Sequence, residues 1–174
     1  PRYVHCSIRW IREGVLTLEY LNGTTNKQIF NNSLEYLAQK RGDLGFNFKR
    51  YYNFLKPIFD ENDHFNDDLL NLACVLSHMD WGLGAFQKAE LVFNETLNTP
   101  LLRLTHNDRI KLALACYWRY CSIKYNPQIE YLKFLNNNEI FSSKQVGSAL
   151  RFAHSLTSIS TIFLEEFKLY KRGD

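Results

Sequence analysis

The sequence predicts an all-α protein, an HD-domain-like helical bundle of about six to eight helices preceded by a short strand-like segment. The first observation is composition: 45% of the 174 residues are hydrophobic and 15% are aromatic, against eight glycines and four prolines, which is typical of a packed helical body. The second is periodicity, because apolar residues recur at helical spacing from residue 26 onward and no strands alternate with these segments. The length suits one domain with a full core.

The first residues follow a different pattern. Residues 3–10, YVHCSIRW, alternate and are rich in β-branched and aromatic side chains, which indicates a short strand that the chain leaves through Gly14. A single strand leaves its edges unpaired, and no later segment offers it a partner. We therefore expect residues 1–21 to be the tail of a preceding domain and residues 22–174 to form the helical domain, with the boundary in the loop at 22–26.

The first two helices are predicted at 26–42 and 46–60, each from a one-sided apolar stripe. In the first helix Gly42 occupies the position of a C-terminal cap. In the second, Pro57 is expected to kink or shorten the last turn. The stripe residues are Ile29, Phe30, Leu34, Leu37 and Ala38 in the first helix, and Phe48, Tyr52, Leu55 and Phe59 in the second.

Two further helices are predicted in the middle of the chain. Residues 66–79 are nearly all apolar at their centre, so this helix is expected to be central and buried, with Asn66 or Asp67 at its start. The next helix, at 84–98, is amphipathic and should stop before Pro100.

The last part of the chain predicts three more helices. The sequence THND at 105–108 is close to a capping box and should open a helix that continues over 109–125. A short helix is expected near 128–136, after Pro127. A long last helix is expected over about 143–168.

The cysteines, the apolar runs and the net charge limit the kinds of site, compartment and partner that the sequence predicts. Cys6, Cys74, Cys116 and Cys121 show no CxxC spacing, and three lie inside apolar runs, so we expect reduced core thiols rather than disulfides or zinc ligands. No apolar stretch reaches the roughly 18–20 residues of a membrane span, and no signal segment opens the chain, so a cytoplasmic protein without membrane contact is expected. The net charge of +3 permits an anionic partner, and the scattered basic residues predict no specific nucleic-acid binding.

His78 and Asp80, in LACVLSHMDWG, are the first candidates for metal chemistry. On a helix, residues two positions apart point roughly 200° apart, so this pair cannot share one ion at close range. His64, His106 and His154 could converge with them, but His64 lies in a polar loop and His106 at a helix start. A hydrolytic centre needs three or more fixed ligands and an open position. The sequence therefore predicts no metal site.

No catalytic motif is recognised either. The glycine-containing residues 82–86 follow a helix rather than a strand and lack the Lys-Ser/Thr ending of a phosphate-binding loop. There is no Gly-x-Ser-x-Gly elbow, and no cysteine is paired with a base by local spacing. We expect no catalytic residue and no cofactor in this chain.

Basic residues beside aromatic ones indicate a possible polyanion site. If they gather on one face, they would form a cationic groove by the same physics that serves nucleic-acid backbones. The alternative is a set of ordinary solvated helix faces. The candidates are Lys49, Arg50, Arg109, Lys111, Arg119, Lys124 and Arg151.

Several segments, in this order, resemble the C-terminal part of the exopolyphosphatase/guanosine-pentaphosphate phosphatase (Ppx/GppA) family. SIRWIREGVL resembles the family's GLREGVL strand exit, and LLNLACVLSHMDWG resembles LRLAACLLSDIGW. RIKLALACYWRY is similar to RAFLALALYYRH, and VGSALRFAHSLTSIS is similar to LGAALRLAYALS. The match is collinear over nearly the whole chain, and the order of the motifs is more specific than any one of them.

The resemblance implies both a fold and a function. Family members carry two actin-like lobes with the phosphate loops, the catalytic carboxylate and Mg²⁺, followed by a helical domain related to HD phosphohydrolases. Residues 1–21 would be the end of the second lobe and residues 22–174 the HD-like domain. In the family that domain helps to grip polyphosphate or guanosine pentaphosphate (pppGpp) and contributes to a homodimer, while hydrolysis takes place in the lobes.

The sequence departs from the family at the HD metal site. His78 stands at the family's acidic position and Asp80 at its glycine, while Gly84 and Tyr120 stand where the family has histidines. The resemblance therefore implies a degenerate metal site. Two alternatives stay open, a self-sufficient metal-dependent HD phosphohydrolase and a helical protein-interaction domain.

Overall fold

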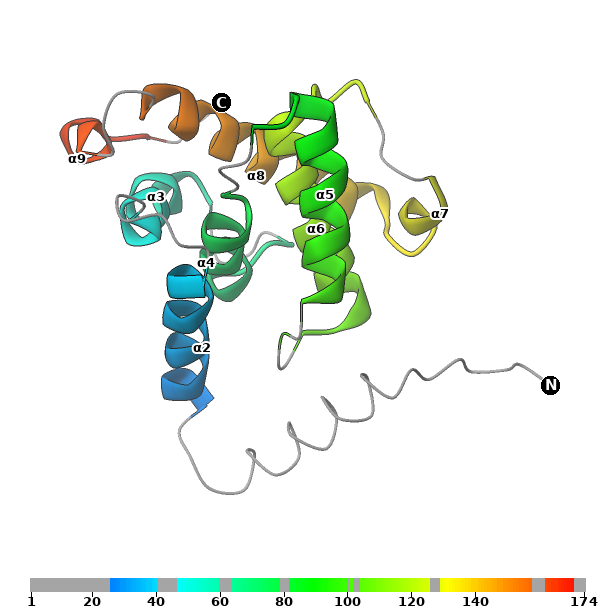
Figure 1. Ribbon diagram of the computed structural model, residues 1–174, viewed down its shortest axis with the longest axis horizontal. Coiled ribbons are helices and arrows are strands. Elements are labelled where there is room, and N and C mark those ends of the chain that lie inside the picture. The colour runs from blue at the N-terminus through cyan, green and yellow to red at the C-terminus, as the bar shows by residue number, and fades with distance from the viewer. Residues whose placement is uncertain are drawn as a thin grey trace.

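The computed structural model describes residues 26–40, 47–59, 64–78, 82–99, 101, 104–125, 129–157 and 162–170. Within these ranges the chain forms eight α-helices and one 3-10 turn and contains no strand (Figure 1). The all-α class predicted from the sequence is confirmed. The strand-like segment at 3–10, the boundary loop and the cap at Gly42 lie outside the described residues.

Helix α6 lies at the centre of this arrangement. It packs most extensively against α8 and α5, and Figure 1 shows α5 alongside it, with α2, α3 and α4 together on one side and α7 on the other. In chain order the elements are α2 (Asn26–Lys40), α3 (Phe48–Leu55), η1 (Lys56–Ile58), α4 (Asp67–Leu76), α5 (Ala85–Asn98), α6 (His106–Tyr120), α7 (Ile129–Leu132), α8 (Asn137–Leu156) and α9 (Phe163–Glu166).

The core surrounds α6 from two sides. Every α6 residue from Arg109 to Arg119 is buried. One hydrophobic cluster joins α6 to α2, α3, α4 and α8, and a second joins it to α5 and to Leu135. A helix that is buried around its whole circumference depends on its neighbours for stability. The α6 residues of the first cluster are Leu112, Ala115 and Cys116, and those of the second are Ile110, Ala113, Leu114, Tyr117 and Trp118.

The closest approach of α6 and α8 is at Gly147. A Cβ atom added there would lie 2.7 Å from the carbonyl oxygen of Ala115 and 2.7 Å from Cβ of Trp118. The Trp118 side chain is fully buried, and its indole N–H donates to the carbonyl oxygen of Tyr125 at 2.9 Å. Only glycine lets the two helices pack this closely.

Side-chain caps begin four of these helices, and the first is Asn47 at the start of α3. Asn66 caps α4 and Thr105 caps α6, as the sequence predicted. Thr105 and Asp108 form a capping box, because each side chain accepts a hydrogen bond from the other's backbone N–H. Asn136 and Glu139 form the same motif at the start of α8. These bonds satisfy donors that would otherwise lack a partner in the first turn.

The second predicted helix is shorter than expected. α3 ends at Leu55, Pro57 lies in the 3-10 turn, and Phe59 has an extended backbone. The effect of Pro57 is as predicted, but the assignment of Phe59 to the helical stripe is wrong. Tyr52 is only half-buried, so the predicted stripe is also rotated from the true one. The buried face consists of Phe48, Tyr51, Phe54 and Leu55.

Other helix ends also differ from the prediction. The helix predicted at 66–79 ends at Leu76, and the one predicted to continue to residue 125 ends at Tyr120. The single last helix predicted over 143–168 is wrong, because the structure has two separate helices, α8 and α9. α8 begins earlier than predicted because of the Asn136 cap. By contrast, α5 ends before Pro100, as expected.

The described cysteines are core thiols. Cys74, Cys116 and Cys121 are buried, and none of these three forms a disulfide. This agrees with the prediction, while Cys6 lies outside the described residues. No helix in the described ranges is long and apolar enough to cross a bilayer.

Candidate anion-binding site

Four of the seven predicted basic residues are exposed or half-buried: Lys49, Arg50, Lys124 and Arg151. Lys49 and Lys124 are exposed, and the Lys49 ammonium lies 3.4 Å from a Glu35 carboxylate oxygen. Arg50 on α3 is half-buried, and its Nε lies 2.6 Å from a carboxylate oxygen of Glu165 on α9. Carboxylates therefore partly neutralise Lys49 and Arg50.

Arg109 and Lys111 are buried near the N-terminal end of α6 and hold neighbouring backbone. The Arg109 guanidinium donates to the carbonyl oxygens of Thr99 at 2.8 Å and Leu101 at 2.5 Å. The Lys111 ammonium donates to the carbonyl oxygen of His64 at 2.8 Å. These two cations fix the segments around α6 and do not form a solvent-facing groove.

Arg119 and Arg151 meet at the opposite end of α6, roughly 15 Å along the helix axis. Arg151, on α8, donates to the carbonyl oxygens of Tyr120 at 3.1 Å and Cys121 at 3.2 Å. Arg119 donates to the carbonyl oxygen of Ser77, the C-cap of α4. The Tyr120 hydroxyl donates to the same carbonyl at 2.8 Å. The ends of α4, α6 and α8 thus come together around these two arginines.

Two histidines border this junction. The prediction placed His78 inside a helix, but His78 directly follows the C-cap of α4 and is not helical. Its ring centroid lies 6.4 Å from that of His154 on α8. Loss of surrounding water lowers the pKa of His154 to about 4, with further contributions from Arg119, His78 and Lys88. The His154 side chain remains exposed overall, so solvent screens part of the charge effect. Asp80 lies outside the described residues.

We call Lys88, Arg119, Arg151, His78 and His154 the Arg119 cluster. Arg151 and His154 are exposed, whereas Lys88 and His78 are half-buried. Each of the five side chains is cationic or becomes so on protonation. The positive potential that depresses the His154 pKa is the kind of field that attracts an anion.

Arg119 is the buried centre of the cluster, with only 4% of its surface exposed. Burial lowers its pKa. Among the residues that the structure describes, Arg119 forms no ion pair with a carboxylate. The Ser77 carbonyl and the Tyr120 ring, whose centroid lies 4.8 Å away, supply partial negative charge instead. Such dipoles offset less charge than a carboxylate does, so the site keeps a net positive character.

The four described histidines fall at two separate places. His64 and His106 lie near the N-terminal end of α6, whereas His78 and His154 lie at the other end. Across the described parts of the chain, no group of three or more His, Cys, Asp or Glu side chains is placed to hold a metal ion.

Sequence patterns did not identify all members of the cluster. The pattern of basic residues beside aromatic ones does not include Lys88, and the sequence suggests His78 and His154 only as candidate metal ligands. No local signal links them, because they come from α5, α8 and the end of α4. Only the packing of α4, α5 and α8 on α6 brings them together.

Comparison with known proteins assigns no family to this chain. No protein-family model matches it, and a search of curated proteins finds no match. The resemblance to exopolyphosphatases therefore rests on the sequence motifs alone.

Proposed function

We propose that this chain is the C-terminal polyanion-binding and regulatory domain of an exopolyphosphatase-like hydrolase. The observation that carries the proposal is Arg119, a buried guanidinium that lacks a carboxylate partner among the described residues and lies beside further cationic groups. A buried charge that is only partly offset gains from an added counter-charge. The sequence motifs supply the substrate class, polyphosphate or guanosine pentaphosphate.

In this proposal the chain positions the substrate and performs no bond cleavage. Phosphate oxygens lie against the exposed Arg151 and the half-buried Lys88, while His78 and His154 donate hydrogen bonds at their edge. Phosphoanhydride hydrolysis takes place in the preceding actin-like lobes, where Mg²⁺ stabilises the developing charge. A homodimer and a cytoplasmic location belong to the same proposal.

The test compares two double variants with the same change in charge. Lys88→Gln with Arg151→Gln removes two cations from the Arg119 cluster, and Lys49→Gln with Lys133→Gln removes two from elsewhere. Binding of labelled polyphosphate is measured by fluorescence anisotropy over a range of salt. We expect the cluster variant to bind about tenfold more weakly, with a salt slope reduced by about one to two, because fewer counterions are released. The control should change affinity by less than about twofold.

Three outcomes contradict the proposal. Equal losses in the two variants would indicate a diffuse effect of net charge. An unchanged affinity of the cluster variant would remove the Arg119 cluster from the site, and failure of the unmodified chain to bind polyphosphate at low salt would end the proposed function. Hydrolysis of nucleotides by this chain with Mn²⁺ would favour the self-sufficient HD phosphohydrolase instead.

A protein-interaction domain is a second candidate, because large apolar side chains are exposed between the end of α6 and the first turns of α8. These side chains are Ile123, Tyr125, Phe134 and Phe141. Exposed aromatic groups close together in the chain are typical of an interface with another protein or a second copy. Light scattering of the unmodified chain and of a Phe134→Glu, Phe141→Glu variant tests self-association. The unmodified chain should be a dimer and the variant a monomer, and a monomeric unmodified chain would contradict the homodimer.

A further inference from the structure

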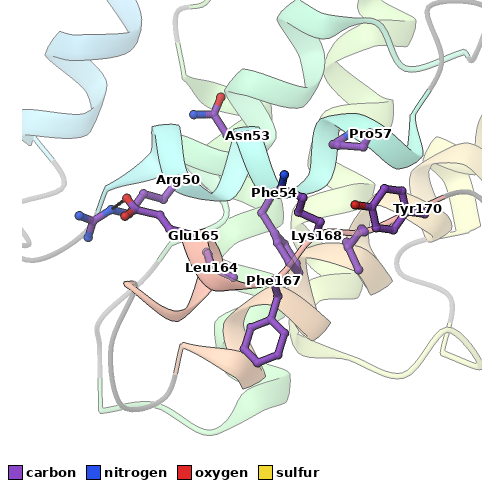
Figure 2. A pocket seen from close by; sticks show the side chains of 10 residues that line it. Arg50, Asn53, Phe54, Pro57, Leu164, Glu165, Phe167, Lys168 and Tyr170 are labelled. Carbon is purple, nitrogen blue, oxygen red and sulfur yellow. Dashed lines mark hydrogen bonds and ion pairs between the residues drawn. The ribbon is translucent and has the colours of Figure 1, made fainter.

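A pocket of about 370 Å³ has no lining residue in common with the Arg119 cluster. Figure 2 shows this pocket. One side consists of α3 and η1, and the other consists of α9 and residues 167–170. The volume falls within the range of small-molecule sites, roughly 300–1,000 Å³. The size therefore suits a compact ligand.

The apolar part of the pocket offers flat surfaces. Phe54 and Leu164 are 4% and 3% exposed and form a buried base, and the exposed Pro57 also lines the pocket. Tyr170 is 78% exposed, so most of its ring is accessible to a ligand. Aromatic rings stack on such surfaces in offset or edge-to-face geometry.

The charged part of the pocket is asymmetric. Arg50 and Glu165 lie 2.6 Å apart and carry opposite charges, so this pair adds no net charge to the pocket. Lys168 is exposed, and it forms no ion pair with any residue in the described ranges. Figure 2 shows the Arg50–Glu165 pair at one end of the pocket and Tyr170 at the other, with Lys168 between them. One positive charge therefore remains beside the aromatic surface.

We propose that this pocket binds a flat aromatic molecule that carries a single anionic group. The ring lies against Phe54, Pro57 and Tyr170, and the anion lies against the Lys168 ammonium. An aromatic cation would be repelled by Lys168, and a neutral ring would desolvate the ammonium without compensation. A polyanion would need more than one uncompensated cation, so this site is independent of the proposed function.

The probes are 2-naphthoate and its neutral counterpart 2-naphthamide, followed by NMR shift perturbation on the full chain. Lys168→Gln removes the charge, and Lys133→Gln is the matched control at an exposed position outside the pocket. We expect Lys168→Gln to weaken naphthoate binding about threefold to tenfold, because one charge-assisted contact is lost. Naphthamide binding should not weaken, because the neutral probe only desolvates the ammonium. Lys133→Gln should bind both probes as the unmodified chain does.

A third variant tests the ring contact separately. Tyr170→Ser should weaken both probes, because the side chain contributes area and no charge. Equal naphthoate affinity with and without Lys168, or shifts confined to residues outside the pocket, would overturn the proposal. So would failure of the unmodified chain to bind either probe. These results leave the polyphosphate experiment unaffected, because Lys168 is not in the Arg119 cluster.

Discussion

At the scale of single residues, the seven predicted basic side chains have very different roles. Arg109 and Lys111 bind backbone carbonyls inside the fold, and Arg50 pairs with Glu165. Arg119, in the last turn of α6, is buried and binds the carbonyl oxygen at the C-cap of α4. In the sequence they look alike, because each is a cation beside apolar or aromatic residues. They differ in whether their side of the helix faces the core. This orientation depends on packing partners that are distant in the chain.

His154 gives a prediction at this scale. Burial, Arg119, His78 and Lys88 lower its pKa from 6.5 to about 4, so the unfolded chain binds the proton more readily than the folded one. The contribution of His154 to the free energy of unfolding is therefore full above pH 6.5. It decreases as the pH falls towards about 4 and levels off below that value.

NMR titration of the imidazole resonances measures this pKa directly, and His154→Gln should flatten the same part of the stability profile in urea. A titration midpoint near 6.5 would contradict the prediction. If polyphosphate binds as proposed, its presence should raise the His154 pKa, because the added negative charge favours the protonated ring.

At the scale of secondary-structure elements, the contact between α6 and α8 gives the next prediction. Gly147→Ala places a methyl group 2.7 Å from the Ala115 carbonyl oxygen and from Trp118 Cβ, neither of which can rotate away. Overpacking of this kind costs about 1–3 kcal/mol, and the better helix propensity of alanine returns about 1 kcal/mol at most. Both contacts lie far below van der Waals distance, so the overpacking cost is expected in the upper half of that range, about 2–3 kcal/mol. The expected net loss in the free energy of unfolding is then about 1–2 kcal/mol.

Urea denaturation measures the effect, and Gly82→Ala is the control because nothing lies within 4 Å of a Cβ atom at that position. The control should stay within about 0.5 kcal/mol of the unmodified chain. A Gly147→Ala variant of unchanged stability would show that α8 can shift away from α6 without cost.

Helix beginnings were easier to predict than helix ends. Asn66 and Thr105 are local signals, since each side chain caps a backbone N–H within three residues. The end of α6 depends on distant contacts: Arg151 binds the carbonyls of Tyr120 and Cys121 from α8. No pattern within 109–125 carries that information, so the prediction continued the helix too far.

At the scale of the whole molecule, the buried thiols report on cooperativity. Cys74 and Cys116 have no exposed surface, and burial raises the pKa of Cys74. Thiolates react far faster than thiols. We therefore expect both cysteines to react with a thiol reagent only when the whole core opens, at equal rates that increase together with urea.

Mass spectrometry of the labelled peptides measures the two rates, and Ser148→Cys, at an exposed position on α8, provides a fast-reacting control. Rapid labelling of Cys74 in native buffer would contradict a single cooperative core. Labelling of Cys74 well before Cys116 would show that α4 separates from α6 on its own.

The sequence was sufficient for the fold class but not for the site. Apolar spacing and capping residues identified the helices that build the core, including the buried α4. The Arg119 cluster draws side chains from four places in the chain, and their meeting follows from how α4, α5 and α8 pack on α6. Local patterns contain no information about that packing, so they do not point to Lys88, and they suggest His154 only as a candidate metal ligand.

The enclosure of α6 has a consequence for how the protein is made. A ribosome releases α5 and α6 well before residues 137–156 leave the exit tunnel. During that interval the part of α6 that α8 covers, around Ala115 and Trp118, lacks its partner and remains open to water. Until α8 emerges, the nascent chain is therefore a partly folded intermediate with exposed apolar surface. Chaperone binding during synthesis should be strongest over that interval.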